Sequence, residues 1–431
     1  MDILIIGNGG REHALAWKAA QSDLADTVYV APGNAGTALE EGVENVDIAS
    51  DDIQELKRFA LEKGIGLTIV GPEAPLVDGV VDAFTAAGLK CFGPSKQAAQ
   101  LEGSKSFTKE FLARHDIPTA AYQVFTEVEP ALAYLQAQGA PIVIKADGLA
   151  AGKGVIVAMD LDTAEEAVRD MLAGNAFGEA GHRVVIEEYL EGEEASFIVM
   201  ADGKHVLSMA TSQDHKRVGD GDTGPNTGGM GAYSPAPVVT EEVHRRIMDE
   251  VITPTIKGMA GEGRPYTGFL YAGLMITADG TPKVIEYNCR FGDPETQPIM
   301  LRMRSDLVAH CLAALQGELE HQHAEWDPRP SLGVVLAAGG YPGSYSKGLP
   351  ISGLPEVELA DRKVFHAGTA LSEDGQVITT GGRVLCATAL GNTVREAQQA
   401  AYELAAQIDW EDMFYRKDIG YRAVERELAG R

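Results

Sequence analysis

The first hundred residues alternate short apolar runs with helical patterns. The apolar runs are Asp2–Ile6, Thr27–Val30, Leu67–Val70 and Leu89–Phe92, and each is followed by a turn containing glycine or proline. This rhythm is typical of βαβ units, in which the strands lie parallel and their carboxyl ends carry the ligand-binding loops. We therefore expect an open parallel α/β domain over residues 1–103.

The rest of the chain divides into further units, because 431 residues exceed what a single hydrophobic core usually organises. A helical pattern runs from Leu101 to Thr119. Residues 122–192 then predict a compact subdomain, with helices at Glu129–Gln138 and Thr163–Ala173 and strands at Ile142–Ala146, Val155–Ala158 and Val184–Glu188. A linker at Glu325–Pro330 precedes a part that begins with strands and ends in one helix near Val394–Ile408. The prediction is an α/β and α+β multidomain chain with domains at 1–103, 104–327 and 328–431.

The composition of the chain disfavours some classes of binding partner. The net charge is −27, which disfavours non-specific binding to nucleic acid, because phosphate neutralisation needs the opposite sign. No apolar run approaches the roughly 18 residues of a membrane span, and the N-terminus has no signal-peptide pattern. The four cysteines, Cys91, Cys289, Cys311 and Cys386, lie far apart and are typical of reduced thiols. We expect a cytoplasmic protein without nucleic-acid or membrane partners.

A loop rich in glycine and lysine lies between two predicted strands, at Asp147–Gly154. Its three glycines allow backbone N–H groups to approach phosphate oxygens, and Lys153 supplies positive charge. A Walker loop would read GxxxxGK[ST] and open a helix, whereas this loop joins two strands. We interpret it as a flap over the phosphates of ATP. The alternative is an ordinary mobile β-hairpin.

The neighbours of this loop favour the ATP interpretation. Lys145 lies on the strand that leads into the loop, and Lys105 lies at the start of a helix, so both ammonium groups could reach the same phosphates. The acidic segment Glu187–Glu194 follows the third strand of the subdomain. Its backbone could pair with an adenine edge, and a carboxylate there could bind the ribose hydroxyls.

A second candidate site lies on the alternating segment Val284–Phe291. Side chains two apart share one face of a strand, so Glu286, Asn288 and Arg290 point together, and Ile285, Tyr287, Cys289 and Phe291 are expected to face a core. A carboxylate and an amide oxygen suit Mg²⁺ shared with phosphates. Arg290 could stabilise a transferring phosphoryl group or bind a carboxylate. The alternative is a half-exposed strand with a polar outer face.

Two further segments predict anion binding. The cluster Asp214–Arg217 precedes the glycine-rich stretch Gly219–Tyr233, which suits a segment that orders over an anionic substrate, although it could be a surface charge cluster. The turn Gly7–Glu12 places backbone donors, a helix N-terminus and Arg11 at one point. Glu12 stands where a dinucleotide fingerprint needs glycine, so a single phosphate fits better than NAD.

Together these stretches resemble the glycinamide ribonucleotide synthetase (phosphoribosylamine–glycine ligase) family of ATP-grasp enzymes. The matching stretches are Ile6–His13, Ala31–Gly36, Gly71–Leu76, Ile144–Gly154, Gln213–Arg217, Gly224–Gly231, Asn288–Gln297 and Arg416–Gly420. The resemblance covers essentially the whole chain. It implies an N-terminal open parallel α/β domain, an ATP-grasp core with a small lid subdomain at 122–192, a C-terminal α+β domain, and a monomer.

The resemblance also implies a reaction of de novo purine biosynthesis. ATP phosphorylates the carboxylate of glycine, and the amine of 5-phosphoribosylamine attacks the acyl phosphate to give glycinamide ribonucleotide, ADP and phosphate. Such catalysis is mainly positioning and charge stabilisation. The alternatives are another ATP-grasp carboxylate–amine ligase, a carboxylase subunit that uses bicarbonate, and a nucleotide-binding regulatory protein without chemistry.

Residue roles follow from the same resemblance. ATP would be bound by Lys105, Lys145, Gly152, Lys153, Gly154, Glu187, Leu190, Glu193 and Glu194, with one of the last two on the ribose. Mg²⁺ or Mn²⁺ would be held by Glu286 and Asn288, and the substrates by Gly9, Gly10, Arg11, Asp214, Lys216, Arg290 and Gly292. Lys145 and Arg290 would be the catalytic residues. Gly9, Gly10 and Arg11 are the candidates for the phosphate of phosphoribosylamine.

Overall fold

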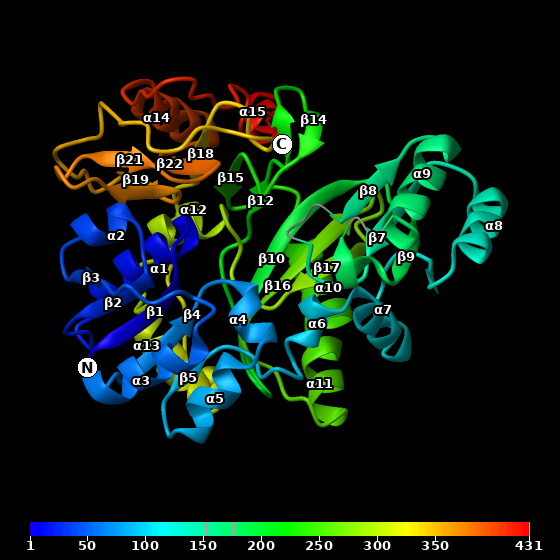
Figure 1. The fold of residues 1–431 in the computed structure, drawn as a ribbon, viewed down its shortest axis with the longest axis horizontal. Helices are drawn as coiled ribbons and strands as arrows, with labels where there is room; N and C mark the ends of the chain where they lie inside the picture. The colour runs from blue at the N-terminus through cyan, green and yellow to red at the C-terminus, as the bar shows by residue number, and fades with distance from the viewer. Residues whose placement is uncertain (151–153, 175–176, 431) are drawn as a thin grey trace.

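The computed structural model describes residues 1–150, 154–174 and 177–430. Figure 1 shows the N-terminal and C-terminal parts packed together beside a central sheet, with a small subdomain that projects on the other side. Within the described residues, no helix combines the length and the apolar character that crossing a membrane requires.

The N-terminal part is the predicted parallel α/β sheet, with strand order β3-β2-β1-β4-β5. Its elements are β1 (Ile3–Gly7), α1 (Gly10–Ala20), β2 (Val28–Pro32), α2 (Ala35–Leu39), β3 (Val43–Asn45), α3 (Ile53–Lys63), β4 (Leu67–Val70), α4 (Glu73–Val77), α5 (Val80–Ala86) and β5 (Cys91–Phe92). Strand β3 was not predicted. It has three residues, of which only Val43 is buried, so it carries no apolar alternation.

The helix predicted from Leu101 to Thr119 is two shorter helices, α6 (Gln100–Gly103) and α7 (Lys105–Arg114). Ser104 separates them in an extended conformation, and its hydroxyl accepts a hydrogen bond of 3.2 Å from the amide of Phe107. This side-chain cap satisfies a donor at the start of α7 and fixes Lys105 in its first turn.

The described residues of 122–192 form a compact unit with its own hydrophobic core, made by residues between Phe125 and Ile186. Its elements are β6 (Tyr122–Phe125), α8 (Val128–Gln138), β7 (Ile142–Ala146), β8 (Val155–Ala158), α9 (Leu161–Leu172) and β9 (Val184–Glu188), with strand order β6-β9-β7-β8. We call residues 122–192 the lid subdomain. Figure 1 shows it at the right, with α8 and α9 on its outer side.

The central sheet has the order β11-β10-β16-β17. Its strands are β10 (Glu193–Asp202), β11 (Val206–Ser208), β16 (Thr267–Ile276) and β17 (Pro282–Asn288), accompanied by α10 (Glu241–Ile247), a π-helical turn (Met248–Ile252), α11 (Thr253–Gly261), α12 (Thr296–Arg302) and α13 (Leu307–Leu315). One hydrophobic cluster joins Leu270 and Tyr287 of this sheet to Phe84 of the N-terminal domain. The two parts therefore share a core.

The C-terminal sheet has the order β12-β15-β18-β22-β19 and is antiparallel throughout. Its strands are β12 (Gln213–Asp214), β15 (Gly231–Ser234), β18 (Ser331–Ala337), β19 (Arg362–His366) and β22 (Arg383–Leu390). Two of the five thus come from before residue 327, and the sheet spans the division that we expect there. The remaining strands of the described residues form two hairpins, β13 (Arg217–Gly219) with β14 (Thr223–Asn226) and β20 (Thr369–Leu371) with β21 (Val377–Thr379).

Two helices end the chain, α14 (Val394–Ala406) and α15 (Tyr421–Leu428), where one was predicted. The first carries the expected apolar face. Only Ala423 of α15 is buried, and the helix has eight residues, so its apolar pattern is shorter than that of α14.

Candidate active site

Strand β17 carries the candidate metal residues, and a bulge sets their direction. Gly273 of β16 pairs with Glu286 and the next residue, Leu274, pairs with Val284, which leaves Ile285 as the extra residue. The expectation that Ile285 faces the core was wrong for this reason, and Val284 takes that place. Beyond the bulge the alternation holds: Tyr287 is buried, and the amide oxygen of Asn288 accepts a 3.3 Å hydrogen bond from Arg290.

Glu286 lies among positive charges. Burial by itself would raise the pKa of Glu286, but Lys216, Lys145, Lys105 and Arg290 outweigh it, and the pKa is lowered. The carboxylate is therefore ionised near neutral pH. Together with the amide oxygen of Asn288 it forms a donor pair that fits a hard divalent cation.

Lys145 links the lid subdomain to β17. Its ammonium group lies 3.1 Å from the carboxylate of Glu187 on β9 and donates a 3.1 Å hydrogen bond to the carbonyl of Ile285. The same carboxylate lies 3.4 Å from the ammonium of Lys109, whose pKa burial lowers to about 8. Lys109 was not predicted, although it stands four residues after Lys105 on one helix, a spacing that places two side chains on the same face.

Lys105 is coupled to the start of the flap. Its ammonium donates a 3.0 Å hydrogen bond to the carbonyl of Gly148, and its backbone amide donates to the carbonyl of Asp147, also at 3.0 Å. The carboxylate of Asp147 accepts from the amide of Ser106 at 2.7 Å and so caps α7. Of the predicted flap residues, Gly152 and Lys153 lie outside the described residues, and the carbonyl of Gly154 accepts from the amide of Ala146 at 2.8 Å.

The acidic segment Glu187–Glu194 runs from the end of β9 to the start of β10, with Leu190 between the two strands. The two glutamates left open for the ribose face different neighbours, as alternation along a strand requires. Glu193 pairs with Arg426 of α15, where one nitrogen–oxygen distance is 3.0 Å. Glu194 lies 3.2 Å from the ammonium of Lys216, on the side of the substrate segment. Of the two glutamates, Glu194 is the one beside the predicted substrate segment.

The side chains of the predicted substrate segment, Asp214–Arg217, have two different roles. Burial raises the pKa of Asp214 to about 7 against the opposing charge of Lys216, and Lys216 faces Glu194. His215 points away and accepts a 2.9 Å hydrogen bond from the amide of Gly420. Arg416, whose role the sequence did not indicate, is buried and lies 3.0 Å from Asp222 in the turn of the β13–β14 hairpin. It ties this hairpin to the C-terminal segment.

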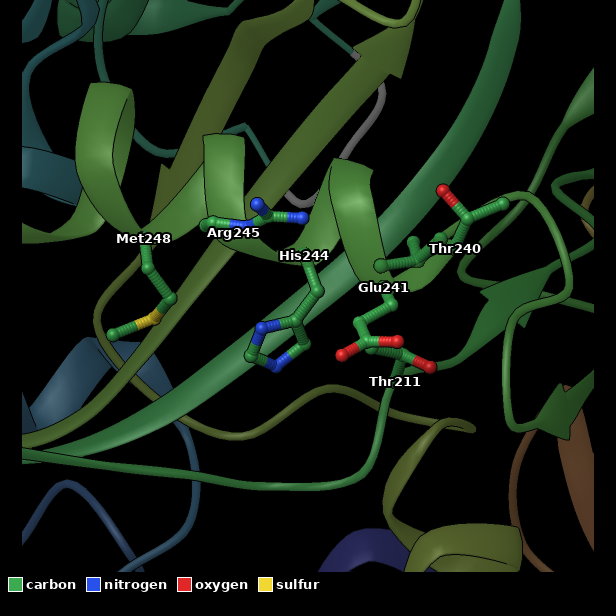
Figure 2. Close-up of a pocket in the computed structure, with 7 residues that line it drawn as sticks. Thr211, Thr240, Glu241, His244, Arg245 and Met248 are labelled. Carbon is green, nitrogen blue, oxygen red and sulfur yellow. The ribbon is translucent and has the colours of Figure 1, made fainter.

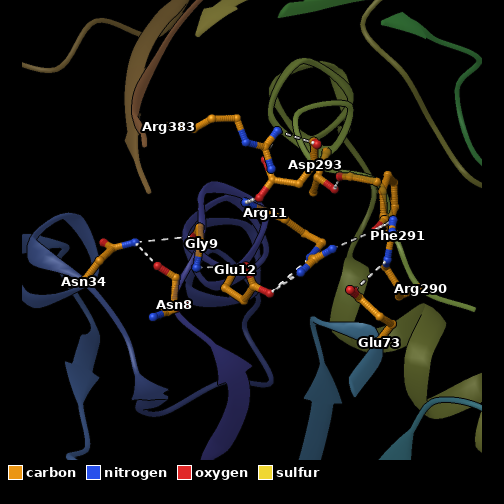
Figure 3. A network of polar contacts seen from close by, with 12 residues as sticks. Asn8, Gly9, Arg11, Glu12, Asn34, Glu73, Arg290, Phe291, Asp293 and Arg383 are labelled. Carbon is orange, nitrogen blue, oxygen red and sulfur yellow. Dashed lines mark hydrogen bonds and ion pairs between the residues drawn. The ribbon is translucent and has the colours of Figure 1, made fainter. Parts of the chain in front are cut away.

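The N-terminal turn contains the predicted donors, but carboxylates already occupy two of them (Figure 3). Glu12 accepts from the amide of Gly9 at 3.0 Å, and Asp293 accepts from the amide of Arg11 at 3.2 Å. The guanidinium of Arg11 donates to Glu12 at 2.8 Å and to the carbonyl of Phe291 at 3.2 Å. A phosphate here would have to displace two carboxylates that repel it. We therefore no longer assign the phosphate of phosphoribosylamine to Gly9, Gly10 and Arg11.

Gly10 has a different reason to be glycine. A Cβ on Gly10 would lie 2.3 Å from the side-chain nitrogen of Gln297, so the start of α1 packs directly against α12. The three residues of the turn remain candidates for contacts to other parts of a substrate.

Arg290 lies between two carboxylates of earlier elements. Its guanidinium is 3.2 Å from Glu73 and 3.4 Å from Glu102, and these charges raise its pKa although burial opposes them. The predicted residue Gly292 lies nearby, where a Cβ would come within 2.2 Å of the carboxylate of Glu295. Arg290 is thus held in place by the N-terminal domain and α6, and the turn after it has no room for a side chain.

A separate pocket of about 490 Å³ lies beside α10 (Figure 2). It is lined by Thr211, Val239, Thr240, Glu241, His244, Arg245 and Met248. None of these is a predicted site residue. The candidate site consequently rests on the side chains that converge around Glu286.

Comparison with known proteins shows the family to which this chain belongs. Models of the phosphoribosylglycinamide synthetase N domain, ATP-grasp (A) domain and C domain match residues 1–102, 103–296 and 331–422. A phosphoribosylamine–glycine ligase of Yersinia pestis is 74% identical over 426 residues, which cover 99% of this chain and 100% of that protein. The chain belongs to the phosphoribosylamine–glycine ligase family. A crystal structure of the phosphoribosylamine–glycine ligase of Thermotoga maritima has a TM-score of 0.85 at 36% identity, covering 97% of this chain and 100% of that one.

The fold of the phosphoribosylamine–glycine ligase family extends further. Biotin carboxylase of Campylobacter jejuni has a TM-score of 0.75 and covers 100% of this chain and 96% of its own, at 15% identity. This likeness concerns the fold alone.

In this member of the family, several residues around the site were not predicted, among them Lys109, Glu73, Glu102 and Arg383. Lys109 had the helical-spacing signal described above. The contacts of the other three join elements that are remote in the sequence.

Proposed function

We propose that this chain joins glycine to 5-phosphoribosylamine with the energy of ATP, through a glycyl phosphate intermediate. The observation that carries the proposal is the set of four cations, Lys105, Lys145, Lys216 and Arg290, whose charges act on the carboxylate of Glu286. Phosphoryl transfer needs positive charge directed at the transferring group. In this chain the four cations around Glu286 supply that charge.

ATP binding is assigned to residues on the lid side of Glu286. Lys105, Lys145 and the flap would hold the phosphates, Glu187 and Leu190 would offer backbone groups to adenine, and Glu194 would bind the ribose. Lys145 is suited to this role because its ammonium already reaches the carbonyl of Ile285, beside Glu286.

Glu286 and Asn288 would hold the divalent cation, Mg²⁺ or Mn²⁺. A bound cation supplies positive charge that offsets the phosphate oxygens during transfer. The described part of β16 carries no acidic side chain, so these two residues are the ligands that we assign on this pair of strands.

In the first step an oxygen of the glycine carboxylate attacks the γ-phosphorus of ATP. The new O–P bond forms as the bond to the bridging oxygen breaks, and ADP leaves with that electron pair. Arg290 would orient the carboxylate and stabilise the phosphoryl charge, because a guanidinium matches both groups. Asp214 would accept hydrogen bonds from the glycine ammonium group.

In the second step the amine nitrogen of phosphoribosylamine attacks the acyl carbon. The C–N bond forms, the C–O bond to phosphate breaks, and the phosphate carries the proton that the amine loses. Lys216 and Arg290 would offset the charge on the departing phosphate. Gly9, Gly10, Arg11 and Gly292 would contact the substrate around this centre.

The remaining assignments concern the setting of the reaction. We propose a cytoplasmic monomer that acts on small molecules and has no nucleic-acid or membrane partner. The four cysteines are buried free thiols, which suits a reducing compartment, and the charge of −27 disfavours nucleic acid. Light scattering of the purified chain would test the monomer.

Two assays test the proposed reaction. With ATP and hydroxylamine, glycine should give glycyl hydroxamate, because hydroxylamine intercepts an acyl phosphate, and ADP should form only when glycine is present. Bicarbonate in place of glycine serves as the control for a carboxylase. ADP release that needs bicarbonate, or that proceeds with phosphoribosylamine but no glycine, would refute the proposal.

The raised pKa of Asp214 predicts a pH dependence. Burial brings this pKa to about 7, so the carboxyl group is neutral below that pH and ionised above it. Only the ionised form pairs with an ammonium group. We therefore expect kcat/KM for glycine, which reports groups of the free enzyme, to rise with pH and level off above about 7. Asp214→Asn should remove this rise at saturating ATP; a variant that keeps it would exclude Asp214 as the titrating group.

A further inference from the structure

Arg383 opens β22 of the C-terminal sheet and reaches two loops of the central region. One terminal nitrogen of its guanidinium donates a 2.9 Å hydrogen bond to the carbonyl of Gly228 and a 2.8 Å hydrogen bond to the carbonyl of Asp293. The same nitrogen is 3.4 Å from the carbonyl of Gly229 and 4.0 Å from the carboxylate of Asp293. Figure 3 shows this side chain directed at Asp293.

The two loops fit around Arg383 with little free space. A Cβ on Gly228 would lie 2.8 Å from the central carbon of the guanidinium, and a Cβ on Gly229 would lie 2.5 Å from the ring of Pro294. Gly229 also has a φ of +124°, which other residues rarely adopt. The hydroxyl of Tyr341 accepts a 3.1 Å hydrogen bond from the amide of Gly228. Arg383 therefore occupies a built junction between three segments.

The first loop leads to Lys216. The backbone amide and the hydroxyl of Thr227 donate hydrogen bonds of 2.7 and 2.8 Å to the carbonyl of Lys216. Thr227 directly precedes the two glycines that Arg383 holds. The position of this loop thus fixes the backbone from which the Lys216 ammonium extends toward Glu194.

The second loop leads to Arg290. Asp293 lies three residues beyond Arg290, and its carboxylate accepts from the amide of Arg11 at 3.2 Å and from the side chain of Gln297 at 2.9 Å. The carbonyl of Asp293 is bound by Arg383, so the C-terminal domain, α1 and α12 meet at this one residue. Lys216 and Arg290 are also the two cations on the substrate side of Glu286.

We propose that Arg383 is a positioning residue for the ligation, which holds the Gly228–Gly229 loop and the Asp293–Pro294 turn together so that Lys216 and Arg290 stay aligned on the reacting groups. The inference rests on the proposed function. Arg383 touches neither cation and acts through the two backbones. Lysine would not replace it, because the plane of the guanidinium also packs against Gly228, and a compact ammonium group on a flexible stem would not fill that space.

The test uses Arg383→Met and Arg383→Lys in the full chain, with Arg362→Met as a matched control. Arg362 lies on β19 of the same sheet and makes a surface pair with Glu403 at 3.2 Å. In both Arg383 variants we expect kcat/KM for glycine and for phosphoribosylamine to fall about 100-fold, the scale that a misplacement near 1 Å can cause. KM for ATP should stay within about twofold, because Lys105 and Lys145 lie on other elements. The control should match the unmodified chain.

Hydrogen exchange gives a readout that does not depend on turnover. The amides of Thr227, Gly229 and Arg11 should exchange faster in both Arg383 variants and not in Arg362→Met. If Arg383→Met fails to fold, the result for Arg383→Lys decides. Unchanged kinetics and exchange would overturn the inference, and so would an equal loss for ATP, glycine and phosphoribosylamine alongside a lower Tm. If the unmodified chain showed no glycine-dependent reaction, the proposed function would fail, while faster loop exchange would still support the junction at Arg383.

Discussion

Replacing Glu286 by alanine should lower kcat by about 1,000-fold or more while the chain remains folded. The carboxylate is the negative point on which Lys216, Lys145, Lys105 and Arg290 act. Without it a divalent cation loses its charged protein ligand, and four cations face one another without their counter-charge. Steady-state rates over a range of Mg²⁺ concentrations, with far-UV circular dichroism as the folding check, would measure the effect.

Two companion variants sharpen this test. Glu286→Gln keeps the shape of the side chain and removes its charge, so it should be almost as inactive as the alanine variant. Glu320→Ala removes a carboxylate that is 53% exposed and should leave kcat unchanged. Near-normal kcat in Glu286→Ala at saturating Mg²⁺ would exclude Glu286 from the metal site.

Replacing Lys145 by methionine should lower kcat/KM for ATP by about 100-fold to 1,000-fold. Methionine has a similar length but no charge, so the phosphates lose one cation, and β7 loses its hydrogen bond to the carbonyl of Ile285. Tm should also fall, because Glu187 loses one of two buried partners. The loss of stability should be smaller than the roughly 3–5 kcal/mol typical of a broken buried pair, since Lys109 remains.

Lys109→Met is the matched control for this prediction. Lys109 pairs with the same carboxylate of Glu187, but its other hydrogen bonds go to Thr119 and Ala120 and not to the carbonyl of Ile285; Thr119 reaches β17 at the carbonyl of Val284. Its replacement should lower Tm with a smaller effect on ATP. Equal losses in kcat/KM for ATP in the two variants would mean that Lys145 acts only through Glu187, and would contradict a direct role on the phosphates.

The sequence determined the features that follow from local backbone geometry. Glycine-ended apolar runs predicted the parallel N-terminal sheet, and the pattern between 122 and 192 predicted the lid subdomain. The two-residue repeat of β17 predicted that Asn288 and Arg290 lie together, and they are hydrogen-bonded. Such patterns are readable because the periods of strands and helices are properties of a single segment.

The tertiary structure decided what depends on remote partners. The bulge at Ile285 arises from pairing with β16, and the donors of Arg11 are occupied because Asp293 comes from 282 residues away. Arg290 is held by Glu73, which is 217 residues distant. Arg383 reaches from the C-terminal sheet to the Gly228–Gly229 loop and the Asp293–Pro294 turn. No local spacing encodes these contacts, because they follow from how whole elements pack. The sequence alone therefore predicted which residues carry charge, and the packing decided where each charge acts.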